Sequence, residues 1–234
     1  MLTAIKPLFT HTPLDLTQIP FQPYITILAN TNGASFGKTI YYNKKTQTID
    51  KKSGIMSGVC RATTVHIKNL TIDLPKILQN LQNNESIIYG WVPGTEASTE
   101  YYAYSQKQCI NIGGIQSTGI YTDQNGLQHA RWTKENFQFS SIVMFDIDSP
   151  PSLPLHLRHT NIESWLDMMD NIYPAFSSLT RVVHESSSNR VVDNNANKIF
   201  GEGGLHIIVE LDKESTSDNR DRWRHGLLVQ ADKE

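Results

Sequence analysis

The sequence predicts a mixed β-sheet with a few helices, an α+β or α/β fold, on three observations. Short runs rich in apolar, β-branched and aromatic residues alternate with segments of helical periodicity. Several of these runs are joined by turn residues typical of hairpins. No segment of the 234 residues approaches the ~20 apolar residues of a membrane span. These patterns favour a mixed fold over an all-α or all-β fold, and we expect no membrane partner.

Strands are predicted where apolar and β-branched side chains gather between turn signals. The first run, YITILAN, is typical of a buried strand. One hairpin is expected to turn near Asn43, and another at Gln124-Asn125-Gly126, because Asn-Gly is a strong turn signal. The predicted strands are residues 24–30, 86–92, 141–148, 180–184 and 205–211, and the predicted hairpins are residues 36–50 and 119–132.

Three helices are predicted from capping residues and apolar spacing. Asp73 is expected to be the N-cap of the first helix, with Pro75 in its first turn and an end near Asn84. Asn161 is expected to cap a second helix through residue 173, and a third covers residues 215–230. The expected apolar faces are Ile77, Leu78 and Leu81 in the first helix and Ile162, Trp165, Leu166 and Met169 in the second.

Length, charge and cysteine content bound the class of protein. We expect residues 1–23, with several Pro and Thr, to form an arm and residues 24–234 to form one domain. The net charge is −2, but residues 1–107 carry +4 and residues 108–180 carry −4. This asymmetry fits a nucleic-acid surface beside a metal site, although ordinary surface scatter explains it equally well.

Two distant cysteines and no secretory signal predict a cytoplasmic protein.

The most informative motif is the Asp-x-Asp at the end of the apolar run SIVMFDID. Side chains alternate along a strand, so Asp146 and Asp148 project from the same face. Two neighbouring carboxylates repel each other unless a cation lies between them, and such oxygen ligands suit Mg²⁺ or Mn²⁺. Ligand sites also tend to open at strand ends. The motif therefore predicts a metal site, and the alternative is a solvated strand end with two acidic residues.

A second polar cluster leads into the last predicted strand. Residues 186–190 read SSSNR and residues 201–206 read GEGGLH. Hydroxyls and glycine-rich backbone amides are natural donors to phosphate. His206 follows two glycines, which let a ligand approach the backbone closely. The cluster predicts a phosphate-binding site, and the alternative for His206 is a hydrogen-bonded structural histidine.

The order of these motifs resembles the archaeo-eukaryotic primase superfamily, and most closely the primase-polymerase domains of phages, plasmids and other mobile elements. Those domains commonly show a stretch similar to residues 131–137 (RWTKENF) before a D-x-D strand. A Ser-rich run, a variable loop and a Gly-Gly-x-His strand then follow. Gly90, after the run SIIY, also matches a glycine position of these domains. The resemblance covers roughly residues 55–230, and its strength lies in the ordered set because each motif is short.

The resemblance implies a primase fold, an α+β fold in which an N-terminal α/β unit packs against an RRM-like unit with a mixed sheet. It implies nucleotidyl transfer from ribo- or deoxyribonucleoside triphosphates on a single-stranded DNA template during replication of a mobile element. Asp146 and Asp148 match the family's catalytic, metal-binding carboxylates for Mg²⁺ or Mn²⁺. The nucleotide-binding residues that it implies are Ser186, Ser188, Arg190, His206, Arg131 and Lys134.

One feature departs from the family pattern. The family carries a third acidic residue on a strand beyond the Gly-x-His strand and the helix after it. This sequence stops at Glu234, where that helix should finish, and Glu210 and Asp212 do not match the position. We therefore expect the sequence to be a piece of a longer protein, and many relatives carry a helicase domain downstream. Two carboxylates alone would bind metal weakly.

Two other classes of function are open on the sequence alone. The first is a non-catalytic, RRM-like nucleic-acid-binding module, in which aromatic side chains stack on bases unless they belong to the core. The second is a D-x-D glycosyltransferase, which accounts for the metal pair but not for the Ser-rich run or the Gly-Gly-x-His strand. The tyrosines considered for base stacking are Tyr41, Tyr42, Tyr101, Tyr102 and Tyr104.

Overall fold

A computed structural model of the chain divides it into two units, each with its own sheet. Unit 1 comprises residues 1–36, 54–67 and 81–140, and unit 2 comprises residues 37–53, 68–80 and 141–234. Within the described residues the chain has two α-helices and a mixed sheet, which confirms the α+β class. The structure describes residues 9–12, 22–37, 39–52, 58–95, 100–105, 119–133, 136–147, 162–172, 174–185, 191–192, 198–200 and 204–211.

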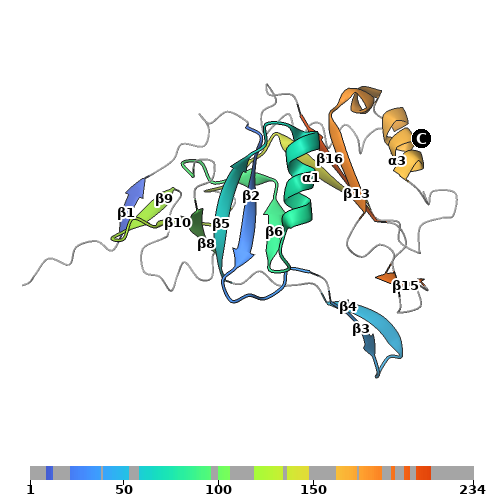
Figure 1. Cartoon of the computed structure of the whole chain (residues 1–234), viewed down its shortest axis with the longest axis horizontal. Helices are drawn as coiled ribbons and strands as arrows, with labels where there is room; N and C mark the ends of the chain where they lie inside the picture. Colours follow the sequence, from blue (N-terminus) through green and yellow to red (C-terminus); the bar gives the residue numbers. More distant parts are fainter. Residues whose placement is uncertain are drawn as a thin grey trace, which may run out of the picture. The chain divides into compact units, whose positions relative to one another are not determined.

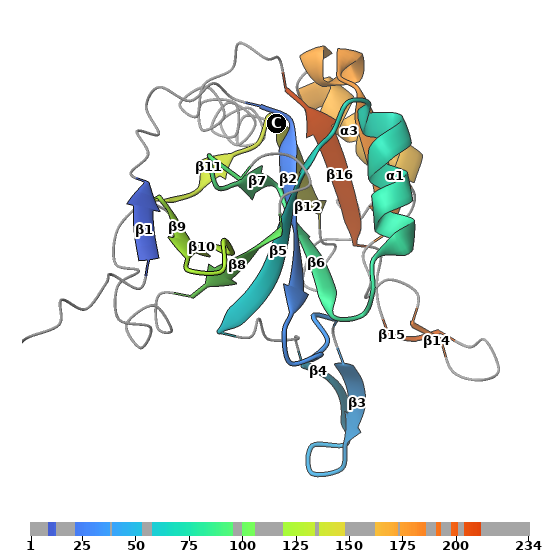
Figure 2. The ribbon, with the colours of Figure 1, turned by 60° about the vertical axis from the view of Figure 1, so that its left-hand side comes forward.

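Unit 1 is built on a seven-stranded sheet with the order β1-β9-β10-β8-β5-β2-β6 (Figures 1 and 2). Neighbouring strands are antiparallel except for β8 and β10, which run parallel and make the sheet mixed. A separate pair, β7 (Gly90–Trp91) and β11 (Gln138–Phe139), is antiparallel. The seven strands are β1 (Phe9–Thr12), β2 (Tyr24–Asn30), β5 (Val59–His66), β6 (Glu85–Ile88), β8 (Glu100–Tyr104), β9 (Ile120–Asp123) and β10 (Gln128–Arg131).

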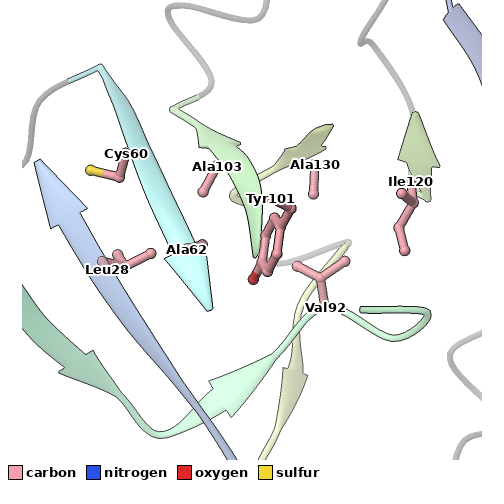
Figure 3. Packing of buried hydrophobic residues seen from close by; sticks show 8 residues of the cluster. All are labelled: Leu28, Cys60, Ala62, Val92, Tyr101, Ala103, Ile120 and Ala130. Atoms are coloured by element: carbon pink, nitrogen blue, oxygen red, sulfur yellow. The ribbon is translucent and has the colours of Figure 1, made fainter. Parts of the chain in front are cut away.

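One buried cluster of unit 1 lies on one face of this sheet (Figure 3), and a smaller cluster with Tyr104 and Tyr121 lies on the other face. Alternate residues of β5 and of β8 enter the larger cluster, as the two-residue period of a strand requires. Three of its members are alanines, and these small side chains leave room for the ring of Tyr101, which is fully buried beside them. The cluster consists of Leu28, Cys60, Ala62, Val92, Tyr101, Ala103, Ile120 and Ala130.

Unit 2 contains a three-stranded antiparallel sheet in the order β12-β16-β13. Two helices and a short 3₁₀ helix accompany it, and α1 contacts β13. Two hairpins, β3–β4 and β14–β15, complete the described part of the unit. The elements are β3 (Thr39–Asn43), β4 (Thr48–Lys52), α1 (Leu70–Asn80), β12 (Ile142–Ile147), α3 (Ile162–Ile172), η5 (Pro174–Ser178), β13 (Arg181–Glu185), β14 (Val191–Val192), β15 (Lys198–Phe200) and β16 (Leu205–Glu210).

Aromatic and ionic contacts attach α3 and η5 to one face of the three-stranded sheet. The rings of Phe145 and Phe176 meet edge to face, 6.0 Å between centroids. The guanidinium of Arg181 lies 5.5 Å from the centroid of Phe176 and binds Asp170 of α3, with 3.0 Å between Nη1 and Oδ1. Because Phe145 and Asp146 are adjacent in a strand, Asp146 points to the opposite face.

Helix α1 begins earlier than the sequence predicts. Its N-cap is Asn69, whose Oδ1 accepts hydrogen bonds from the backbone N–H groups of Thr71 and Ile72 at 3.1 and 3.2 Å. Asp73 lies inside the helix, and its Oδ2 accepts from the N–H groups of Lys68 and Asn69, each at 2.9 Å. The predicted cap at Asp73 is therefore wrong, because an equally good cap four residues earlier starts the helix. The helix ends at Asn80 and not near Asn84.

Most other predicted elements that fall within the described residues are present in the structure. The predicted strands at residues 24–30 and 205–211, the hairpin at 119–132 and the helix at 161–173 are confirmed within a residue or two. The predicted strand 86–92 is interrupted at Tyr89, and β14 and β15 lie in residues 186–204, where no strand is predicted. Residues 9–12 of the predicted arm form β1, which pairs with β9. The predicted helix 215–230 lies outside the described residues.

Neither α1 nor α3 is long and apolar enough to cross a membrane, and they are the only α-helices among the described residues.

Candidate functional site

Strand β12 carries the first candidate residue at its exposed end. Ile142 and Val143 are buried, whereas the side chain of Asp146 is 57% exposed. The strand therefore runs from a buried start to an exposed carboxylate, which is compatible with a metal site and with the alternative of a solvated strand end. Among the predicted site residues the structure describes Asp146, His206 and Arg131. The others, Asp148, Ser186, Ser188, Arg190 and Lys134, lie outside the described residues.

Three polar side chains form a row across the three-stranded sheet. The Cα register pairs His206 of β16 with Asp146 of β12 on one side and with His184 of β13 on the other. Side chains at paired positions project from the same face. Nε2 of His206 lies 3.3 Å from Oδ1 of Asp146, and Nδ1 of His206 lies 3.2 Å from Nε2 of His184. The structure thus brings two predicted site residues together and adds a third.

The direction of the hydrogen bonds in this row follows from its last member. Nδ1 of His184 lies 3.0 Å from the carbonyl oxygen of Glu185, which can only accept. Nε2 of a neutral His184 then accepts from Nδ1–H of His206. Since Nδ1 of His206 then carries one proton, a hydrogen bond from Nε2 of His206 to Oδ1 of Asp146 requires a second proton on the same ring. The row is therefore fully hydrogen-bonded when an imidazolium at His206 faces a carboxylate at Asp146.

The two histidine rings also hold each other in place. Their centroids are 4.6 Å apart and their planes are nearly perpendicular, at 87°. With both ring nitrogens of His206 facing partners, rotation about its side-chain bonds would break both contacts. The side chain of His206 is 21% exposed, so a ligand can still reach it from this face. The arrangement presents an oriented imidazole ring beside an accessible carboxylate, which is suited to a bound phosphate and its counter-cation.

A metal ion could contact this row only at Asp146. Among the residues that the structure describes, no group of three or more His, Cys, Asp or Glu side chains is arranged to hold a metal ion. The ring nitrogens of His206 face His184 and Asp146, and Nδ1 of His184 faces the carbonyl oxygen of Glu185, so the rings do not point at a common centre. The accessible carboxylate of Asp146 is a hard oxygen ligand of the kind that Mg²⁺ and Mn²⁺ prefer. Its chemistry fits such an ion.

Arg131 belongs to unit 1, on β10, in register with Tyr104 of β8. Asn136, in the same motif, has a structural role. The buried amide of Asn136 donates to the carbonyl oxygens of Gly119 and Arg131, at 3.1 and 3.0 Å, and accepts from the N–H of Gly119. These bonds tie the start of β9 to the end of β10.

Gly90 has a steric role in the same unit. A Cβ at this position would collide with the ring of Phe137 and would lie 2.7 Å from the carbonyl oxygen of Gln138. Only glycine therefore allows β7 to approach β11 this closely. Packing within unit 1 therefore explains why a glycine stands at position 90.

Burial separates the five tyrosines with a predicted role in base stacking. Tyr101 and Tyr104 are buried core residues, and Tyr102 is half-buried and stacks on His129. Burial raises the pKa of the Tyr101 phenol to about 12, an effect that the nearby hydroxyls of Thr26, Thr64 and Thr95 oppose. Tyr41 and Tyr42 are the exposed pair.

His184 is the site residue that sequence reasoning missed. The sequence places it only in a short predicted strand, at residues 180–184. The usable signal is that this strand and the one at 205–211 each carry a histidine near one end, but only the register of β13 against β16 aligns them.

Comparison of the chain with protein-family models, with curated proteins and with solved structures finds no match.

Proposed function

We propose that the chain is a nucleotidyl-transfer domain of the primase or primase-polymerase class. The observation that carries the proposal is the pairing of Asp146 with His206 on neighbouring antiparallel strands. Oδ1 of Asp146 and Nε2 of His206 are 3.3 Å apart, at an accessible strand end. The sequence motifs alone do not require these two residues to meet. Their contact supports the resemblance, in which a metal-binding carboxylate and a triphosphate-binding histidine serve the same nucleotide. The proposed fold is accordingly the primase fold, with β12-β16-β13 in its RRM-like unit.

In this proposal each residue of the row has a distinct task. A divalent ion bound at Asp146 and Asp148 would stabilise charge on the α-phosphate and on the attacking and leaving oxygens. Nε2–H of His206 would donate to the triphosphate in exchange for Asp146, once that carboxylate binds the ion, while Nδ1–H keeps its bond to His184. The serines at 186 and 188, Arg190 and the basic pair Arg131 and Lys134 are proposed to contact the nucleotide or template phosphates. Substrate positioning, and not proton abstraction by His206, is the expected contribution of these side chains.

The test is triphosphate binding by calorimetry with Mn²⁺ present, for the parent and for Asp146→Asn and His206→Ala. We expect Asp146→Asn to remove the Mn²⁺ dependence of binding. We expect His206→Ala to weaken binding by about 1–3 kcal/mol, the range for losing a hydrogen bond to a charged group. Asp167→Asn is the matched control, because Asp167 is an exposed aspartate of α3 in the same unit. Primer extension on single-stranded DNA then measures incorporation by the same variants.

Binding that is equal in the parent, Asp146→Asn and His206→Ala would contradict the proposal. UDP-glucose is the comparison ligand, because a D-x-D glycosyltransferase would bind it in preference to a nucleoside triphosphate. Preferential, Mn²⁺-dependent binding of the sugar nucleotide would move the assignment to that class. If nucleic acid binds without regard to Mn²⁺ or to either substitution, and triphosphate does not bind, the non-catalytic binding module would be the better description.

The non-catalytic module remains the second candidate because of one observation. Tyr41 and Tyr42, adjacent residues of β3, are both exposed. Exposed paired aromatic side chains are typical of surfaces that stack on unpaired bases. This surface is compatible with either function, so the metal dependence of triphosphate binding is what separates the two.

A further inference from the structure

The two strands β3 and β4 form a hairpin, Thr39–Asn43 and Thr48–Lys52, which we call the basic hairpin. It is a two-stranded sheet of its own, drawn as a separate ribbon in Figure 1. Its register pairs Tyr41 with Asp50 and Tyr42 with Ile49. A hairpin of two strands buries little apolar surface. A core therefore does not account for its two large aromatic side chains.

The tyrosines of the basic hairpin are exposed on both of its faces. Only four large hydrophobic side chains are exposed among the described residues, and two of them are Tyr41 and Tyr42, at 46% and 59%. Adjacent residues of a strand point to opposite faces. Each face of the basic hairpin therefore offers one ring to a partner. A flexible, chain-like partner that passes around the edge of the hairpin can contact both rings.

The charge of the basic hairpin is opposite in sign to that of the chain. Residues 39–52 contain four lysines and one aspartate, a net of +3, while the whole chain carries −2. Lys44, Lys45 and Lys52 are exposed. The aspartate, Asp50, accepts hydrogen bonds from Nδ2 of Asn43 at 2.6 Å and Oγ1 of Thr48 at 2.9 Å. It has a structural role across the hairpin, and the exposed charges are those of the lysines.

The turn of the basic hairpin is held by its own hydrogen bonds. The N–H of Lys45 donates to Oδ1 of Asn43 at 3.0 Å, and the N–H of Gln47 donates to the carbonyl oxygen of Asn43 at 2.8 Å. Gln47 adopts a left-handed φ of 57°, which closes the four-residue turn. Lys44 and Lys45 therefore lie at a defined tip, two and three residues from Tyr42.

We propose that the basic hairpin binds single-stranded nucleic acid, with Tyr41 and Tyr42 stacking on bases and the tip lysines contacting phosphates. A single strand is favoured because a duplex hides the faces of its bases, whereas unpaired bases stack on aromatic rings without regard to sequence. Net positive charge complements the phosphate backbone. That the bound nucleic acid is the template of the reaction rests on the proposed function. Binding of single-stranded nucleic acid to the basic hairpin does not rest on it.

The test is fluorescence anisotropy with a labelled single-stranded DNA of about 20 nucleotides, long enough for one binding site, in EDTA and without nucleotide. We expect Tyr41→Ala/Tyr42→Ala to raise the Kd roughly fivefold or more, the lower end for losing one stacked base. Tyr41→Phe/Tyr42→Phe keeps the rings and should bind like the parent. On an abasic strand of equal length the Ala variant and the parent should have the same Kd, because only phosphates remain.

A matched pair of charge variants tests the phosphate contacts. Lys44→Gln/Lys45→Gln removes two charges from the tip, and Lys68→Gln/Lys76→Gln removes two exposed charges at α1. The tip variant should lower the slope of log K against log salt by about 0.7 for each phosphate that it no longer neutralises, as for single strands. The α1 variant should keep the slope of the parent. The same titrations with single-stranded RNA and with duplex DNA determine which nucleic acid is preferred.

The proposal is overturned if the Ala variant binds like the parent, if the Phe variant is as weak as the Ala variant, or if duplex binds as tightly as single strand. It is also overturned if both charge variants lose affinity equally. Asp146→Asn should bind the strand normally. If the parent binds the single strand but no triphosphate, only the proposed function is contradicted. If the parent binds triphosphate and the hairpin variants bind the single strand like the parent, only the role of the basic hairpin is contradicted.

Discussion

The row Asp146–His206–His184 depends on three single residues that face one another across β12, β16 and β13. An accessible carboxylate beside a histidine is a common surface pair and is worth little by itself. Here the second histidine restricts the ring of the first, so the orientation of His206 is set before a ligand arrives. A ring that is already oriented loses less conformational entropy when it binds a phosphate.

His184 is therefore expected to act as a positioning residue for His206. His184→Ala removes the acceptor at 3.2 Å from Nδ1 of His206 and should weaken triphosphate binding by about 1 kcal/mol, the usual net value of one hydrogen bond. His184→Gln restores an acceptor and should recover part of that loss. The ¹⁵N spectrum of the His206 ring, which reports its tautomer, should change in His184→Ala and not in the Asp167→Asn control. Unchanged binding and an unchanged spectrum would contradict this role.

At the scale of one motif, residues 131–137 show how a functional resemblance and a structural role overlap. Asn136 joins β9 to β10 through buried hydrogen bonds, and Phe137 occupies the space that Gly90 leaves open. Leaving the partners of a buried amide unsatisfied costs about 1–3 kcal/mol each. Loss of function after substitution at Asn136 or Gly90 would thus reflect destabilised packing, whereas Arg131 can be tested for nucleotide contact.

At the scale of an element, two side chains together cap the N-terminus of α1. Asn69 satisfies N–H groups inside the first turn, and Asp73 reaches back to the N–H groups of Lys68 and Asn69. This reciprocal arrangement resembles a capping box with its acidic member one position later than usual. The hydrogen bond from Asn69, the largest contribution, lowers the pKa of the Asp73 carboxyl below its usual value of 3.8.

The lowered pKa of Asp73 predicts a pH dependence of stability with a definite sign. A carboxyl whose pKa is lower in the folded state stabilises the fold above pH 3.8, and this contribution is lost as the pH falls through the folded pKa. Asp73→Asn keeps an acceptor but cannot ionise. Urea unfolding midpoints for the variant should lie below those of the parent at neutral pH and approach them near pH 3. A constant difference across this range would contradict the assignment.

At the scale of the whole molecule, the chain passes repeatedly between the two units. Each unit is assembled from three separate segments, with changes of unit near residues 36, 53, 67, 80 and 140. Neither unit can therefore be cut out as one continuous segment. Unfolding of one unit releases the ends of segments in the other, which couples the two.

This coupling predicts a single unfolding transition. Cys60 lies buried in the core of unit 1, where its Sγ donates to Oδ1 of Asn30, so it should react with a thiol reagent only when that unit opens. In a Cys109→Ser background, the urea midpoint for labelling of Cys60 should coincide with the midpoint of the far-ultraviolet circular dichroism. Labelling of Cys60 at distinctly lower urea would show that unit 1 unfolds independently.

Local chemistry explains what the sequence predicted correctly. The runs at residues 24–30 and 205–211 form strands because their apolar, β-branched side chains suit a buried sheet, and Asn125-Gly126 turns because Gly126 adopts a φ of 81°. Trp165 and Met169 are buried as their helical spacing predicts. Asp146 and His206 are recognisable as candidates from short motifs, since residue type and strand position are local properties.

The tertiary structure decided everything that depends on pairing between distant segments. The register of β12 and β13 against β16 aligns Asp146 and His184 with His206, and a shift of one residue would turn each side chain to the other face. Burial likewise distinguished Tyr101 in the core from Tyr41 and Tyr42 on the basic hairpin, although their local sequences look alike. The physical reason is that register and burial come from contacts between segments far apart in the chain, and the residues next to a position do not encode them.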